Sequence, residues 1–385
     1  MDILLMEPST NKQKVKLSTI FMGLYFFIAP LDTLQVFGGI SILRILIILP
    51  MFFCIFDFLN AKDFKIDKSI LWLISFIVFG FIGLTFSIDI NSTIAKLSTF
   101  TLYALFLIFG SIKGYNQKEY EFLVKMFIFS SWFAIALSFF FEVYQGGRLT
   151  YLLSNTATED QNAFGGYLLF AGGFYFYELL RSKKIFNLIP LIIMVYYLLL
   201  TGSRGSLLAF IVVIFILLLL NGKKNIITKG IGMLFAFFFF YFTLSIILSF
   251  LSPALANRFK FDEILQTGAG GRFTIWEVLY NYFIQSNVIV KFFGNGLGTV
   301  SIIYRTAHNN WLELLIETGI IGVSLFFAAI ASFVKKSIDI RSPLLISILA
   351  GYITMTFSLS IFSYKPMWNL MLLILIAPKN KSIRF

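Results

Sequence analysis

The sequence predicts an all-α polytopic membrane protein with about twelve transmembrane helices and one large loop outside the cytoplasm that contains short amphipathic helices. Three observations support this fold class. Hydrophobic residues make up 58% of the 385 residues, charged residues only 13%, and the mean hydropathy is +0.87. The apolar residues gather in long runs, and most basic residues lie in short clusters between those runs. This composition excludes an ordinary soluble domain.

The apolar runs give the expected membrane spans. A helix needs about 20 apolar residues to cross a bilayer core of roughly 30 Å, because its backbone amides find no water there. The expected spans, of which the last is the shortest, are 17–37, 40–59, 69–87, 95–112, 122–144, 162–180, 185–202, 205–221, 227–251, 310–334, 343–362 and 365–378.

The basic clusters set the expected orientation, because cytoplasmic loops retain Lys and Arg. With the N-terminus inside, most of the 31 basic residues fall in cytoplasmic segments, and both termini are expected to be cytoplasmic. The basic N-terminus leads into an apolar span without a signal-peptide cleavage site. The expected organisation is helices 1 to 9 in residues 1–251, the large loop in 252–309, and helices 10 to 12 in 310–385.

Several function classes find no support in the sequence. The net charge of +12 could suggest nucleic acid, but the basic residues do not form one face, so we expect membrane lipid and no nucleic acid as a partner. The only cysteine, Cys54, cannot form an intrachain disulfide. With one histidine and one cysteine, no metal site is expected. Gly294, Gly296 and Gly298 lack the strand and helix of a nucleotide fold and indicate tight turns.

Some basic residues are expected outside the cytoplasm against the positive-inside rule. For Arg44, Lys96, Lys260 and Lys291, we favour solvated side chains or side chains that reach the lipid head groups. Arg204 differs, because it lies between two apolar runs in Thr201-Gly202-Ser203-Arg204-Gly205. An arginine at the membrane edge is costly unless it is paired or faces a watery cavity, so Arg204 is a functional candidate.

Further arginines on the same side extend this candidate site. They are Arg272, Arg305, Arg258 and Arg148, and Arg272 starts an expected amphipathic helix, 272–283, near the membrane surface. Guanidinium groups match phosphate oxygens in a bidentate fork. The sequence therefore predicts a phosphate-bearing ligand that is delivered from the membrane.

The only histidine, His308, lies where this loop turns into the apolar run that follows it. Imidazole is the side chain best suited to exchange a proton at neutral pH, so His308 is a candidate general base. The alternative is a histidine that merely satisfies a helix N-terminus. Asn309 and Glu313 could orient it, and Glu313 and Glu317 could instead cap the outer turns.

Three stretches resemble the bacterial superfamily of O-antigen ligases and O-antigen or exopolysaccharide polymerases. They are Leu200 to Gly205, Gly271 to Trp276, and Ala307 to Glu313 followed by Glu317 to Gly322. The resemblance implies a metal-independent glycosyltransferase, without a cofactor, in the bacterial inner membrane. Its donor would be an undecaprenyl-diphosphate-linked glycan at the periplasmic face, its acceptor a second glycan, and a chain-length regulator and a flippase its companion proteins.

The family's two essential arginines correspond to Arg204 and Arg272, and its essential histidine to His308. The resemblance implies that the arginines hold the diphosphate leaving group. It implies that the histidine activates a sugar hydroxyl of the acceptor for inverting attack at the anomeric carbon.

Two alternatives to a polymerase stay open. Trp276 and the glycine cluster 294–298 favour a polymerase, and the turn at 360–366 lacks an acidic residue that is typical of ligases. A ligase, which transfers the glycan to lipid A-core, is nevertheless close in sequence. A transporter or flippase for a lipid-linked sugar is the alternative of another class, although no pair of glycine- or proline-broken spans is found in matching halves.

Overall fold

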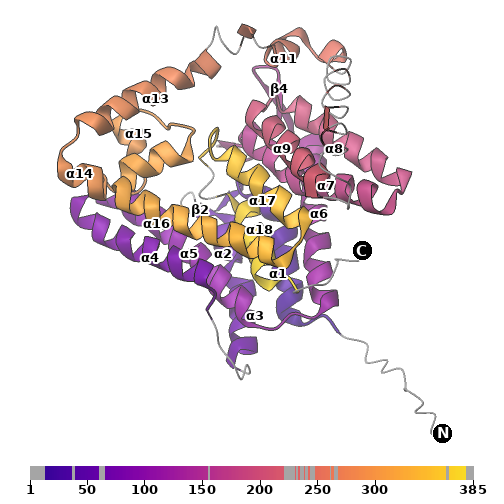
Figure 1. Ribbon diagram of the computed structural model, residues 1–385, viewed down its shortest axis with the longest axis horizontal. Helices are drawn as coiled ribbons and strands as arrows, with labels where there is room; N and C mark the ends of the chain where they lie inside the picture. Colours follow the sequence, from indigo (N-terminus) through magenta and orange to yellow (C-terminus); the bar gives the residue numbers. More distant parts are fainter. Residues whose placement is uncertain are drawn as a thin grey trace.

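The computed structural model describes residues 14–36, 40–59, 66–154, 157–220, 251–260, 262–263, 268–360 and 364–378, with short pieces between 230 and 250. The predicted span 227–251 therefore lies largely outside the described residues. The described chain is mostly helical (Figure 1).

The longer helices, in chain order, are α1 (Leu17–Phe27), α3 (Ile48–Leu59), α4 (Lys68–Gly83), α5 (Ile90–Ile112), α6 (Gln117–Phe140), α7 (Gln161–Ser182), α8 (Leu188–Leu200), α9 (Arg204–Leu220), α13 (Gly268–Gln285), α16 (Asn310–Ile340), α17 (Pro343–Met355) and α18 (Lys365–Ile376). The short helices are α2 (Ile42–Leu46), α11 (Pro253–Asn257), α14 (Val288–Phe293) and α15 (Val300–Ile303), with 3-10 turns η1 (Ala29–Leu31), η2 (Leu84–Phe86) and η3 (Ile185–Asn187).

Among the described residues, five helical segments are long and apolar enough to cross a membrane. They are Ile42–Leu59, Lys68–Phe86, Ile90–Ile112, Gln117–Phe140 and Asn310–Ile340. Shorter apolar helices begin within one residue of the start of five more predicted spans: Leu17–Phe27, Ile185–Leu200, Arg204–Leu220, Pro343–Met355 and Lys365–Ile376. The protein is therefore a membrane protein, while the count of twelve spans stays a prediction.

The expectation of an all-α fold is wrong in two short places. Strands β1 (Gln35–Val36) and β2 (Ile40–Ser41) pair antiparallel, and β4 (Arg148–Ser154) pairs with both β3 (Glu142–Gln145) and β5 (Ala157–Thr158). The predicted spans 17–37 and 122–144 are consequently too long. Pro30 ends the first helix in a 3-10 turn, and Gly146 and Gly147, with φ of 58° and 76°, form the hairpin turn that follows the second.

Helix α7 lies inside the bundle. It contacts α6, α8, α9 and α17. A side chain at Gly166 would overlap the Tyr364 hydroxyl, and one at Gly173 would overlap Ile348. Glycines on this helix therefore allow close helix approach, which is typical of packing between membrane helices.

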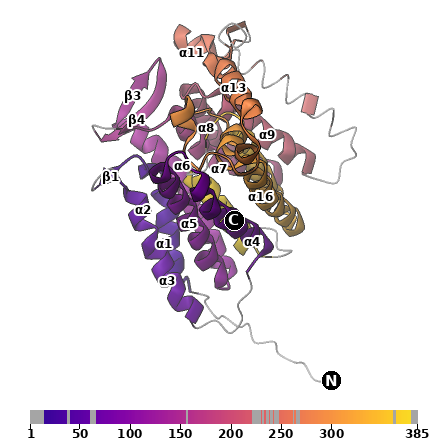
Figure 2. The ribbon, with the colours of Figure 1, turned by 90° about the vertical axis from the view of Figure 1, so that its left-hand side faces the viewer.

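The bundle has two distinct ends. At one end, α5 begins beside the loop after α14, where the Ile88 N–H donates to the Asn295 carbonyl at 2.9 Å, and α16 begins after His308. At the other end, α5 finishes at Lys113, and Lys336 near the end of α16 pairs with Asp67 before α4. Figures 1 and 2 show α11 and α13 at the end opposite α3.

A buried ionic network ties the second end together. The Lys113 ammonium lies 3.2 Å from the Glu119 carboxylate, and both side chains are 1% exposed. Lys113 also donates to the Ser18 hydroxyl at 2.7 Å, and Thr19 donates to Glu119 at 2.6 Å. These contacts link α1, α5 and α6, so both charges are paired and hydrogen-bonded as burial requires.

We expect Lys113→Met to lower the unfolding free energy by about 3–5 kcal/mol, because it leaves the buried Glu119 carboxylate without its countercharge. The thermal midpoint in detergent measures this. Lys113→Met/Glu119→Gln should recover much of the loss. The control is Lys336→Met, which breaks a pair with side chains 26% and 30% exposed, and it should cost about 1 kcal/mol or less. Equal losses in the two single variants would contradict this account.

Candidate functional site

The turn between α8 and α9 places Arg204 at the first residue of α9. Gly202 has a φ of 58°, and a side chain there would come within 3.0 Å of the Arg148 side chain, so both conformation and space require glycine. The turn is held internally, because the Ser203 N–H donates to the Thr201 hydroxyl at 3.1 Å and the Ser203 hydroxyl to Ser206 at 2.8 Å.

Three arginines surround this turn. Arg148 Nε donates to the Thr201 carbonyl at 2.8 Å and its Nη2 to Asn162 Oδ1 at 3.0 Å. Arg204 Nε donates to the Arg258 carbonyl at 2.6 Å, and Arg258 Nε returns to the Gly202 carbonyl at 3.4 Å. Residues from β4, α9 and the end of α11 thus meet at one turn.

Arg272 has no described hydrogen bond to this group but lies near enough to act on it through its charge. Burial lowers the pKa of Arg148 to about 10, and the positive charges of Arg258, Arg272 and Arg204 act in the same direction, while Asp160 opposes them. Burial also lowers the pKa of Arg272, where Asp160 opposes and Arg258 adds to the effect. We call Arg148, Arg204, Arg258 and Arg272 the arginine cluster.

The arginine cluster has an excess of positive charge, which Asp160 and Glu263 offset only in part. None of its four guanidinium groups makes a salt bridge within the described part of the chain. A guanidinium group with a pKa near 10 still carries its charge at neutral pH. Like charges brought together and partly desolvated favour binding of an anion, which removes their repulsion.

His308 lies on a loop that is held from three sides. The Ala307 carbonyl accepts from Trp276 Nε1 of α13 at 2.8 Å, and the Ala307 N–H donates to Glu313 Oε1 of α16 at 2.8 Å. On the other side of His308, the Asn310 N–H donates to the Thr356 carbonyl after α17 at 2.8 Å. His308 itself has a φ of 48°, a left-handed conformation that is strained for a side chain of this size.

Helix α13 connects the two halves of the site. Arg272 and Trp276 are four residues apart and therefore lie on one face, separated by about 6 Å along the axis. Gly270 and Gly271, with φ of 77° and 78°, interrupt the helix immediately before Arg272. One face of one helix thus carries an arginine of the cluster and the side chain that holds the His308 loop.

The glycine cluster 294–298, in the loop after α14, fixes that loop to α16. Helix α16 is interrupted at Gly319, which has a φ of 62° and a ψ of −170°. The carbonyls of Ile316 and Glu317 instead accept from the N–H groups of Asn295 at 3.0 Å and Gly296 at 2.9 Å. A side chain at Gly294 would overlap the Glu317 carbonyl, so this contact requires glycine.

Other residues predicted for the site take different positions. Arg305 is exposed, its guanidinium carbon lies 5.9 Å from the centroid of the Tyr304 ring, and no described contact joins it to the arginine cluster. Asn309 caps α16 through its side chain, which accepts from the N–H of Trp311 at 3.1 Å. Glu313 reaches the loop through Ala307 and also accepts from the Ser360 hydroxyl at 2.6 Å.

Two structural roles are hard to predict from the sequence. Arg148 lies more than fifty positions from the turn that it contacts. Trp276 stands out in the sequence only as part of a motif, although its indole nitrogen holds the His308 loop. The signal for Arg148 was an arginine directly after the Gly146-Gly147 turn on the side where basic residues are rare.

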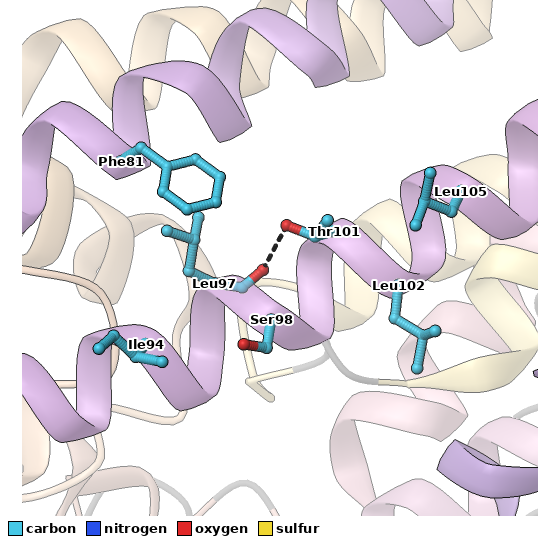
Figure 3. Close-up of a pocket in the computed structure, with 7 residues that line it drawn as sticks. All are labelled: Phe81, Ile94, Leu97, Ser98, Thr101, Leu102 and Leu105. Carbon is cyan, nitrogen blue, oxygen red and sulfur yellow. Dashed lines mark hydrogen bonds between the residues drawn. The ribbon is translucent and has the colours of Figure 1, made fainter.

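A groove of about 260 Å³ lies between α4 and α5 (Figure 3). None of the candidate site residues lines it. It is lined by Phe81, Ile94, Leu97, Ser98, Thr101, Leu102 and Leu105. The Thr101 hydroxyl donates to the Leu97 carbonyl at 2.9 Å. The groove has no titratable group in its lining, so it is not suited to acid–base chemistry.

Comparison with known proteins gives a family match over the part of the chain that contains this site. No curated protein matches the chain significantly. Residues 189–327 match the family described as O-Antigen ligase, a range that contains Arg204, Arg258, Arg272 and His308. Over residues 189–327 the chain is therefore similar to the O-antigen ligase family, consistent with the superfamily of O-antigen polymerases and ligases.

Proposed function

We propose that the chain is a glycosyltransferase of the bacterial inner membrane, a polymerase that joins undecaprenyl-diphosphate-linked oligosaccharide repeat units at the periplasmic face. The observation that carries this proposal is the arrangement on α13, where Arg272 lies four residues before Trp276, whose indole donates to the Ala307 carbonyl beside His308. The O-antigen ligase family domain supports a substrate in O-antigen synthesis. Twelve spans with both termini in the cytoplasm would give the site the required orientation.

The arginine cluster would bind the diphosphate of the donor. Hydrogen bonds from a charged group contribute roughly 1.5–3 kcal/mol each, and guanidinium groups make them in pairs with phosphate oxygens. Arg148, Arg204 and Arg258 use Nε for the protein backbone, which orients each guanidinium plane before the ligand arrives. Preorganised positive charge stabilises the negative charge that develops on a leaving diphosphate.

His308 would act as the general base. It removes the proton from an acceptor hydroxyl, whose oxygen forms a new bond to the anomeric carbon of the donor sugar. The bond from that carbon to the diphosphate oxygen breaks, its electron pair stays with the diphosphate, and the configuration inverts. The donor brings its own activated bond, so the proposed reaction needs no nucleotide or metal.

A ligase is the second candidate, and the matched family favours it by its description. The same donor site and base would serve a ligase, because the two reactions differ only in the acceptor. Lipid A-core would then replace the second glycan.

His308→Ala should lower turnover by about 10² to 10⁴, the usual contribution of general acid–base catalysis. Elongation of a lipid-diphosphate glycan by protein in liposomes measures this. Trp276→Phe removes one hydrogen bond to the loop and keeps the ring, so it should cost only about tenfold. Unchanged glycan chain length with His308→Ala in protein of normal abundance would rule out His308 as the base.

Arg204→Gln and Arg272→Gln should each lower kcat/KM by about 10- to 100-fold, because each loses charged hydrogen bonds to the diphosphate. Arg305→Gln is the matched control, since Arg305 is exposed and joined to the arginine cluster by no described contact. It should retain nearly full activity. Equal losses in all three variants would show that the diphosphate does not bind where the arginine cluster lies.

A deletion strain distinguishes polymerase, ligase and carrier. For a polymerase, gels of surface polysaccharide should show a single repeat unit on lipid A. A ligase should instead leave finished glycan on the undecaprenyl carrier. For the purified protein, elongation without an ion gradient supports an enzyme, whereas translocation of the lipid-linked sugar without elongation would overturn the proposal.

A further inference from the structure

Helix α14 packs directly on two helices that are long enough to cross a membrane. The ring of Phe293 lies 5.9 Å from that of Phe79 in α4 and 4.8 Å from that of Phe86 in η2, measured between centroids. On its other side, a side chain at Gly319 of α16 would overlap the Phe292 carbonyl. These contacts hold α14 against the end of α4 and against α16 near its interruption at Gly319.

The remaining surface of α14 is apolar and uncovered. Val288 is 68% exposed, Ile289 54% and Phe292 46%. The helix has one charged residue, Lys291, and no acidic one. Three large apolar side chains in six residues are more than the scattered exposure that a water-facing surface shows.

This apolar surface continues the lipid-facing surface of the spans. Ile320 follows the Gly319 contact directly and is 45% exposed, and Ile82, about one helical turn after Phe79 on the same side of α4, is 50% exposed. Phe81, which is 53% exposed on the same helix, lines the groove in Figure 3. Exposed apolar residues on a helix that crosses a bilayer face lipid chains, so the neighbouring surface of α14 has the same surroundings.

We propose that α14 is an interfacial anchor, inserted in the membrane surface at this end of the bundle, and that its occupant is phospholipid. Val288, Ile289 and Phe292 contact the upper part of the acyl chains, and Lys291 lies at the depth of the lipid phosphates. An apolar face with a basic residue and no acidic one is the composition that interfacial helices use. The inference depends on the packing of α14 and not on the proposed enzymatic activity.

The anchor would also set the distance between the membrane surface and α13, the helix that carries part of the candidate site. Helix α13 runs from α14 toward α11 (Figure 1). Because α14 is fixed both to α16 and to the lipid surface, the end of α13 that carries Arg272 is held at a defined height above the membrane.

Spin labelling of the full chain in liposomes of phosphatidylcholine and phosphatidylglycerol tests the anchor. Cys54, the only cysteine, is buried in α3, so a Cys54→Ala background accepts single cysteines elsewhere. Nitroxides at positions 289 and 292 are the test positions. Position 81 is the lipid-facing reference, and position 281, an exposed asparagine on α13, is the water-facing reference.

The measurement is the accessibility of each label to oxygen, which concentrates in lipid, relative to a water-soluble nickel chelate. We expect the ratio at positions 289 and 292 to lie close to that at position 81 and well above that at position 281. A ratio like that of position 281 would overturn the proposal in favour of a water-facing helix. Low accessibility to both reagents would overturn it in favour of a protein contact. Thermal unfolding of each labelled variant checks that the fold is intact.

Discussion

The interruption of α16 at Gly319 is the constraint on which the candidate site depends. It releases the carbonyls of Ile316 and Glu317 from the helix, and buried carbonyls need donors. The loop after α14 supplies them through Asn295 and Gly296. Non-helical backbone in a membrane protein is tolerated where other parts of the protein satisfy it. This exchange of hydrogen bonds fixes α14, and through α14 the position of α13, to the membrane helices.

Two different forces then assemble the site on that frame. Hydrogen bonds hold the His308 loop at Ala307. Its carbonyl accepts from Trp276, and its N–H donates to Glu313. The arginine cluster, in contrast, is a concentration of like charge in which Arg148, Arg204 and Arg258 donate to backbone carbonyls, and Asp160 and Glu263 offset only part of the charge. A site of this kind stores electrostatic free energy that a diphosphate would release on binding. The left-handed backbone of His308 also costs conformational free energy, and the surrounding contacts keep the residue in this conformation.

The sequence predicted the helices better than their ends. Five predicted spans coincide with helices long enough to cross a membrane, because hydropathy depends on local composition. In the predicted span 17–37 the helix nevertheless ends at Phe27, and in the predicted span 122–144 it ends at Phe140. Short strands follow in both places. Apolar residues near Pro30 and before Gly146 look the same in a hydropathy profile whether they continue a helix or form a hairpin. Their conformation is decided by turn geometry and strand pairing.

Composition and position along the chain alone predict an apolar protein with arginines where basic residues are rare, one histidine, and glycines in two clusters. Which arginines lie together depends on the packing of the folded chain. Packing brings Arg148, which lies in a hairpin, to the turn that contains Gly202. Arg305 is only three positions from His308 in the sequence, yet it is exposed and has no described contact to the cluster. Such contacts depend on how helices pack and where they break, and these long-range interactions leave no pattern in one sequence.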